Sequence, residues 1–177
     1  MDRPLNISKP LLMEMLRRWV PEFKGFRVMQ HVVPLRCVDV CICLGLTIVG
    51  DEVQFDDEIC GVVGSLFDGE AVTINTITKK IKSMVSSNEV DDVDGVCRLY
   101  SLMCFVVLYF PTTSSRIRAL PFKLLDNIVS LSSYNWGGAV YTFLINAISL
   151  SYKVYVQQKN KHAISIVGAV PVMQVIV

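Results

Sequence analysis

The stretch SSYNWGGAVYTFLINAISLSY, residues 132–152, decides how the chain is classified, because neither it nor the five residues before it carry a charged side chain. Three interpretations compete: a membrane-spanning helix, a buried helix of a soluble domain, and a loop that cradles a ligand at Gly137 and Gly138. A spanning helix needs about 20 mostly apolar residues. The strongly apolar part, residues 139–150, is shorter, and polar side chains interrupt the rest. We therefore expect a helix in the centre of a soluble domain and no membrane contact.

The composition is that of a folded protein with a large core. Hydrophobic residues make up 52% of the chain and charged residues 19%, so an intrinsically disordered protein is excluded. Domains usually have about 100–200 residues, and we therefore expect residues 1–177 to form one domain.

The charge balance gives no general reason to expect binding to nucleic acid or to an anionic membrane, since the net charge is +1. The densest basic runs are short, and a solvated helix face is the ordinary role of such runs. Nucleic-acid binding stays open as an alternative, provided that separate basic residues converge in space. This candidate basic surface consists of Arg17, Arg18, Lys79, Lys80, Lys82, Arg116 and Arg118.

The hydrophobic pattern predicts a mainly α-helical fold with about seven or eight helices. One small β-hairpin is expected near the N-terminus, in residues 25–36, where apolar and polar side chains alternate for a few residues. Helices are expected in residues 8–23, 37–46, 56–69, 73–85, 91–110, 120–131 and 135–152, and a last one begins near His162.

Local patterns predict the ends and faces of some of these helices. Gly45 is placed to end the helix at 37–46 as a glycine cap. The three acids at 56–58 would lie at the positive end of the helix at 56–69. The helix at 73–85 is amphipathic, and its core face would consist of Ile74, Ile77, Ile81 and Met84.

No catalytic, cofactor or metal site can be assembled from the sequence. Cys37, Cys41 and Cys43 come nearest to a metal cluster, but a zinc site would need a second cysteine pair or suitably spaced histidines. His31 and His162 have no serine or cysteine motif beside them, so a nucleophilic triad has no support. We expect no enzyme activity, no metal and no cofactor.

The six cysteines lie in apolar surroundings, and the first ten residues lack the apolar region of a signal peptide. Free, buried thiols in a reducing intracellular compartment are the expected state.

Two blocks resemble a known family. The first, LRRWVPEFKGFRVMQHVVPLRCVDVCICLGLTIVGD, covers residues 16–51, and the second, LLDNIVSLSSYNWGGAVYTFLINAI, covers residues 124–148. Together they resemble the plant mobile domain, which is also labelled aminotransferase-like. Residues 76–84 and 92–111 are similar to a related plant domain of unknown function found beside Ulp1-type protease domains in transposon-derived genes. The matching motif residues include Trp19, Pro21, Asp39, Leu44, Gly45, Leu46, Asp126, Tyr134, Trp136 and Gly137.

The chain departs from the family pattern in two places. Arg36 stands where the family usually has Thr or Ser before a helix, so the usual helix cap is missing. The family's last apolar helix tends to carry Trp and Glu-His, which do not occur before Val177, so the domain is expected to be clipped at its C-terminus.

The resemblance implies a non-catalytic protein-interaction domain in a nuclear plant protein derived from a mobile element. It also implies roles in transposon silencing or gene-expression control and, for some members, a protein phosphatase partner. A nucleic-acid-binding module is the alternative, and an enzyme is the least favoured class. The sequence does not indicate whether the chain self-associates.

Overall fold

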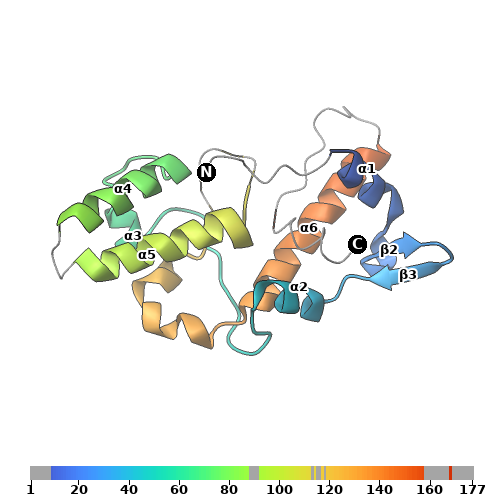
Figure 1. Ribbon diagram of the computed structural model, residues 1–177, viewed down its shortest axis with the longest axis horizontal. Coiled ribbons are helices and arrows are strands. Elements are labelled where there is room, and N and C mark those ends of the chain that lie inside the picture. Colours follow the sequence, from blue (N-terminus) through green and yellow to red (C-terminus); the bar gives the residue numbers. More distant parts are fainter. Residues whose placement is uncertain are drawn as a thin grey trace. The chain divides into compact units, whose positions relative to one another are not determined.

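The protein is mainly helical, with a small antiparallel sheet near the N-terminus, so the predicted fold class is confirmed (Figure 1). The chain forms two compact units in this computed structural model: unit 1 is residues 1–48 with 137–177, and unit 2 is residues 49–136. The structure describes residues 9–87, 92–112, 114, 117, 119–157 and 168.

Unit 1 begins with a helix that leads directly into the sheet. Helix α1 (Lys9–Arg18) is followed by β1 (Trp19–Val20), the 3₁₀ turn η1 (Pro21–Phe23), β2 (Gly25–Val28) and β3 (His31–Pro34). All neighbouring strands are antiparallel, and Trp19 pairs with Phe26 in the register of β1 and β2. The predicted hairpin is confirmed as β2–β3. The helix expected at 8–23 ends early, because Trp19 and Val20 join the sheet.

Helix α2 (Cys37–Leu44) has well-defined ends. The Asp39 carboxylate accepts hydrogen bonds from the Arg36 backbone N–H and from its guanidinium, each at 2.9 Å, so it holds Arg36 at the start of the helix. Gly45 has a φ of 67°, and its N–H donates to the carbonyl of Cys41. The predicted glycine cap is therefore confirmed.

Helix α6 (Trp136–Val156) occupies most of the uncharged stretch. Among the described helices it is long and apolar enough to cross a membrane, by length and composition only, and 33% of its most apolar window is buried in the structure. A helix buried nearly all round was expected, but exposed Thr142, Asn146 and Leu150 show a single buried face. That face consists of Trp136, Gly137, Val140, Leu144, Ile145, Ala147, Ile148 and Ser151.

Unit 2 is built on a helical hairpin. Helix α4 (Ile74–Ser87) packs against α5 (Asp92–Cys104), and a Cβ on Gly95 would lie 2.3 Å from the terminal methyl of Met84. The shorter elements are α3 (Gly61–Ser65), the π-helical turn η2 (Phe105–Tyr109) that extends α5, and the 3₁₀ segments η3 (Lys123–Asp126) and η4 (Ile128–Ser133).

Three local predictions for unit 2 are wrong. The helix expected at 56–69 is confined to α3, so the acids at 56–58 precede it and do not occupy its first turn. The helix expected at 120–131 is two 3₁₀ segments, because Asn127 is extended, with φ −121° and ψ 90°. Ile74 was assigned to the core but is 50% exposed. The helix expected from His162 lies outside the described residues.

Candidate functional site

Most family-motif residues serve the fold. Trp19 is 2% exposed and its ring meets Phe26 edge-on, at 5.1 Å between centroids. Asp39 and Gly45 hold the two ends of α2, as described above. Tyr134 is half-buried and pairs with Asp51 in an isolated bridge. Leu44 and Leu46 are also half-buried, and Pro21 is exposed.

Two motif residues hold the start of α6, each within its own unit. In unit 2, the Trp136 indole N–H donates to the Leu131 carbonyl at 2.6 Å, and its ring lies 4.8 Å from that of Phe105. In unit 1, the Gly137 N–H donates to the Thr47 carbonyl at 2.9 Å. A Cβ on Gly137 would lie 2.2 Å from the Cys41 sulfur, so this glycine provides a close helix contact and no ligand cradle.

Asp126 completes a reciprocal pair of helix caps in unit 2. Its carboxylate accepts from the Val62 N–H in the first turn of α3 at 2.7 Å. The Asp56 carboxylate in turn accepts from the Lys123 N–H, at the start of η3, at 2.9 Å. A Cβ on Gly61, whose φ is 72°, would lie 2.5 Å from the Asp126 carboxylate, so glycine is required there.

We expect Asp126→Ala to lower the free energy of unfolding by about 1–2 kcal/mol, because α3 loses its N-terminal acceptor. Asp126→Asn keeps one acceptor oxygen and should lose less. The matched control is Asp57→Ala, which removes an exposed acid that has no hydrogen-bond partner among the described residues and should leave stability within about 0.5 kcal/mol. Urea denaturation measures all three, and equal losses for Asp126→Ala and Asp57→Ala would contradict the cap.

Three arginines of unit 1 line a groove of about 370 Å³. Arg17 and Arg18 come from the end of α1, Arg27 from β2 and Tyr152 from α6. The sequence analysis missed Arg27, because only the pairing of β1 with β2 brings it beside the end of α1. The groove is lined by Arg17, Arg18, Trp19, Val20, Pro21, Glu22, Arg27 and Tyr152.

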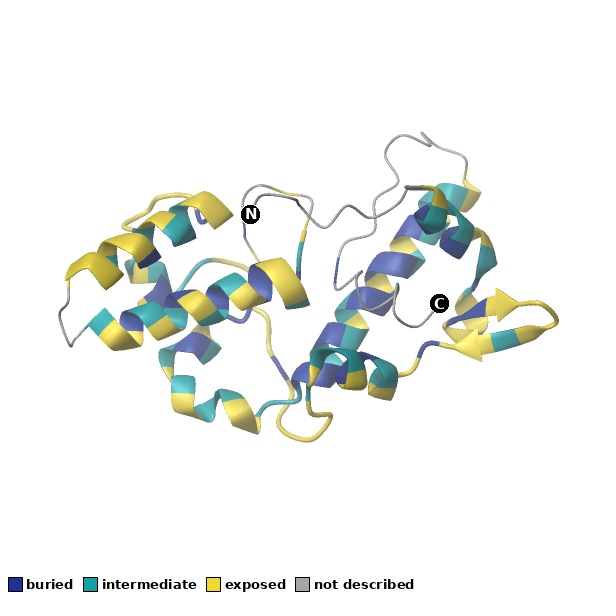
Figure 2. Ribbon diagram, in the orientation of Figure 1, coloured by how far each residue is buried: buried dark blue, intermediate teal, exposed yellow. Residues whose placement is uncertain are grey.

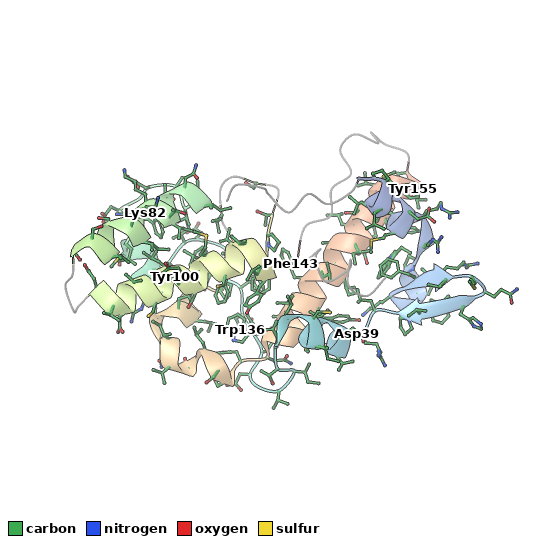
Figure 3. The ribbon with its side chains drawn as sticks, in the orientation of Figure 1. Asp39, Lys82, Tyr100, Trp136, Phe143 and Tyr155 are labelled. Carbon is green, nitrogen blue, oxygen red and sulfur yellow. The ribbon has the colours of Figure 1, made fainter. Side chains whose placement is uncertain are left out.

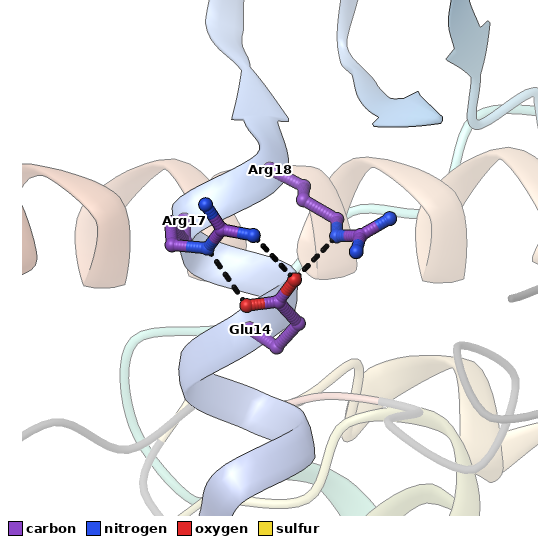
Figure 4. A network of polar contacts seen from close by, with 3 residues as sticks. All are labelled: Glu14, Arg17 and Arg18. Carbon is purple, nitrogen blue, oxygen red and sulfur yellow. Dashed lines mark hydrogen bonds and ion pairs between the residues drawn. The ribbon is translucent and has the colours of Figure 1, made fainter. Parts of the chain in front are cut away.

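Glu14 orients two of these arginines (Figure 4). Its carboxylate accepts from Nε and Nη2 of Arg17, both at 2.7 Å, and from Nε of Arg18 at 2.6 Å. The hydrogen bonds from Arg17 and Arg18 lower the pKa of Glu14 from 4.5 to about 2. The contacts are therefore complete above pH 4.5 and are lost as the pH falls toward 2. All three side chains are substantially exposed, so the network orients groups more than it stabilises the fold.

The other residues of the candidate basic surface do not line this groove. Lys79, Lys80 and Lys82 belong to α4 in unit 2. The Nζ of Lys80 lies 3.9 Å from the Oδ2 of Asp68. Lys79 and Lys80 also line a small cavity together with Glu70. Figure 3 shows Lys82 on this helix. Arg116 and Arg118 lie outside the described residues, so the candidate basic surface is not shown as one face.

The outward face of α5 is apolar, which is unusual for an exposed helix. We call Val93, Cys97, Tyr100, Cys104 and Val107 the α5 outer stripe; all five are exposed. Figure 2 shows the exposed positions of this helix, and Figure 3 labels Tyr100 among them. The spacing of four, three and four residues keeps the first four on one side of α5, and Val107 follows in the π-helical turn η2. The sequence contains this signal, but apolar residues on all sides of the helix suggest complete burial instead.

The cysteines are free, and their environments differ. Burial, followed by the neighbouring Cys37, raises the pKa of the Cys41 thiol to about 11, so that this thiol is inert near neutral pH. Cys97 and Cys104 are exposed, in contrast to the expected burial. Within the described residues, no three His, Cys, Asp or Glu side chains are grouped closely enough to hold a metal ion.

Comparison with known proteins gives one match. The family model described as "Domain of unknown function (DUF8566)" matches residues 3–169 of the chain. No curated protein and no solved structure matches.

Proposed function

The chain belongs to this family of domains of unknown function, DUF8566, and we propose that it is a non-catalytic protein-interaction domain. The observation that carries the proposal is the α5 outer stripe in unit 2. Tyr100 at its centre is 56% exposed, and Val93 near one end is 58% exposed.

Helix α5 has two apolar faces, whereas an ordinary surface helix has one. Its inward face consists of Gly95, Leu99 and Leu102, all of which are buried, and buried Val106 continues this face in η2. The outer stripe therefore adds nothing to the core of unit 2, and in water it leaves apolar area exposed at a cost of about 25 cal/mol per Å². Contiguous apolar patches of this kind mark interaction sites on soluble proteins.

The geometry of the stripe supports a helical partner. Positions separated alternately by four and three residues form the seam along which two helices pack, with side chains of one helix between those of the other. An amphipathic helix with apolar anchors at the same spacing would fit this seam. Tyr100, a large amphipathic side chain at the centre, has the character of an interface hot spot.

The cellular setting rests on the family resemblance of residues 16–51 and 124–148 to the plant mobile domain. We assign the protein to the nucleus, in the control of transposons or gene expression, with a protein phosphatase as one partner class. The same proposal assigns α6 to packing within unit 1 and not to a membrane. A nucleic-acid-binding module is second, since the basic residues described are few and several are paired with acids.

The test compares proteins recovered from plant nuclei with the wild-type chain and with Tyr100→Lys, using quantitative mass spectrometry after nuclease treatment. We expect at least one protein to bind the wild type reproducibly and to fall at least about tenfold with Tyr100→Lys, because a charge in an apolar interface must be desolvated. Circular dichroism should show that the variant is folded, since Tyr100 is 56% exposed.

The matched control is Ile74→Lys, which places the same charge at another exposed apolar position of unit 2, on α4. This control should retain the partner. Equal loss with both variants would contradict a role for the stripe. Recovery of nucleic acid alone, or of no protein that survives nuclease treatment, would overturn the proposed function.

A further inference from the structure

The groove of unit 1 has features that its role in the fold does not explain. Its volume of about 370 Å³ falls in the range of small-ligand sites, about 300–1,000 Å³. Five elements supply its lining, and they bring Tyr152 beside residues of the N-terminal part of the chain: Arg17, Arg18, Trp19, Glu22 and Arg27.

The arginines differ in how many donors they have already used. Arg17 donates to Glu14 through Nε and Nη2. Among the described residues, Arg18 donates only through Nε, so its two terminal nitrogens have no partner there, and the Arg27 guanidinium has none either. A guanidinium with unused N–H groups matches the geometry of carboxylate and phosphate oxygens. The groove therefore holds two arginines that are available to an anion.

The small net charge around the groove limits the number of anionic groups that it can bind. Glu14 and Glu22 balance two of the three arginines, so about one unbalanced positive charge remains. A nucleic-acid strand would need a longer basic track than this. The charge fits one anionic group.

Apolar and donor groups complete the lining. Val20 and Pro21 give one part of the groove an apolar surface, and the Tyr152 hydroxyl can donate or accept a hydrogen bond. The Trp19 Nε1–H is buried and lacks an acceptor in the described structure. Because this nitrogen has no exposed surface, it is not itself a donor to a ligand in the groove.

From these contacts we propose that the groove binds one oxyanion, a carboxylate or a phosphate monoester, carried on an apolar or aromatic body. Arg27 and the free terminal nitrogens of Arg18 hold the oxyanion, and Glu14 keeps the Arg18 side chain in place. The apolar body packs on Val20 and Pro21. This inference concerns unit 1 and does not depend on the α5 outer stripe.

The experiment titrates the whole protein with phenyl phosphate, benzoate and inorganic phosphate, and follows the two tryptophan indole N–H signals by NMR. Trp136→Phe assigns the signals, since only the Trp19 signal remains. We expect saturable shifts of the Trp19 signal with phenyl phosphate or benzoate, and weaker binding of inorganic phosphate, which lacks the apolar body. The tighter of the first two ligands identifies the oxyanion.

Arg27→Gln should weaken that binding at least about tenfold, because a charge-assisted hydrogen bond is lost. Arg27 is exposed, so the variant should remain folded. The matched control is Lys24→Gln, which removes an exposed positive charge that does not line the groove and should leave the affinity within about twofold.

Three results would overturn the proposal: no saturable shift with any of the three ligands, an equal loss of affinity in Arg27→Gln and Lys24→Gln, or oligonucleotides that bind more tightly as their length increases. The last result would show that the surface follows a nucleic-acid strand and does not accept a single anion. An anion-binding failure in these experiments would leave the protein-partner result with Tyr100→Lys unaffected.

Discussion

Replacement of Trp136 by alanine is expected to lower the free energy of unfolding by about 3–5 kcal/mol, the usual cost of truncating a large buried aromatic residue. Trp136 is 8% exposed, and its ring lies 4.8 Å from that of Phe105. The change also leaves the Leu131 carbonyl without the indole donor that reaches it at 2.6 Å. The free energy of unfolding of a small domain is only about 5–15 kcal/mol, so this substitution would remove a large part of it.

Urea denaturation monitored by circular dichroism measures this change, and Trp136→Phe is the matched control. Phenylalanine keeps an aromatic ring beside Phe105 but cannot donate to Leu131, so we expect a smaller loss than for alanine. A Trp136→Ala protein that has normal stability but lacks one specific binding activity would contradict the structural role. That result would make residues 136–138 a binding site.

The sequence predicts the regular elements of this fold because their signals are local. Helix α4 follows from Ile77 and Ile81 at helical spacing, and both side chains are buried. The end of α2 follows from Gly45, whose left-handed conformation favours glycine. The β2–β3 hairpin follows from a short alternating segment. In each case, the residues that determine the local structure are close to one another in the sequence.

Elements that depend on distant partners could not be predicted in the same way. Helix α3 starts at Gly61 because Asp126 accepts from the N–H of Val62 in its first turn, sixty-four positions away. The segment before it contains acids that resemble a helix start, yet Asp56 instead accepts from Lys123 of η3. Local pattern cannot distinguish these roles, since the capping carboxylate and the capped helix are far apart in the sequence.

The candidate sites also combine features with local sequence signals and features that depend on distant residues. Arg17 and Arg18 could be selected from sequence because they adjoin each other, whereas Arg27 joins them only through the pairing of β1 with β2. The α5 outer stripe has helical spacing in the sequence. Its exposure could not be predicted, because apolar residues on both faces of a helix predict burial on both.

Replacement of Gly137 by alanine is expected to lower the free energy of unfolding by about 1–3 kcal/mol, the typical cost of overpacking. A Cβ at this position would lie 2.2 Å from the Cys41 sulfur and 2.7 Å from the Thr47 carbonyl oxygen. Alanine favours a helix over glycine by up to about 1 kcal/mol, so two effects oppose each other. The clash should dominate, because the Thr47 oxygen belongs to the backbone and also accepts from the Gly137 N–H at 2.9 Å.

Gly64→Ala, in α3, separates the two effects. Its Cβ would meet only the Ile59 side chain and backbone, at 3.3 Å and beyond, so the gain in helix propensity should roughly balance or exceed any strain. Cys41→Ala combined with Gly137→Ala should recover part of the loss, because the nearest clashing atom is removed while the Thr47 oxygen remains. If Gly137→Ala were as stable as Gly64→Ala in thermal denaturation, close approach of α6 to the end of α2 would not be the reason for glycine at this position.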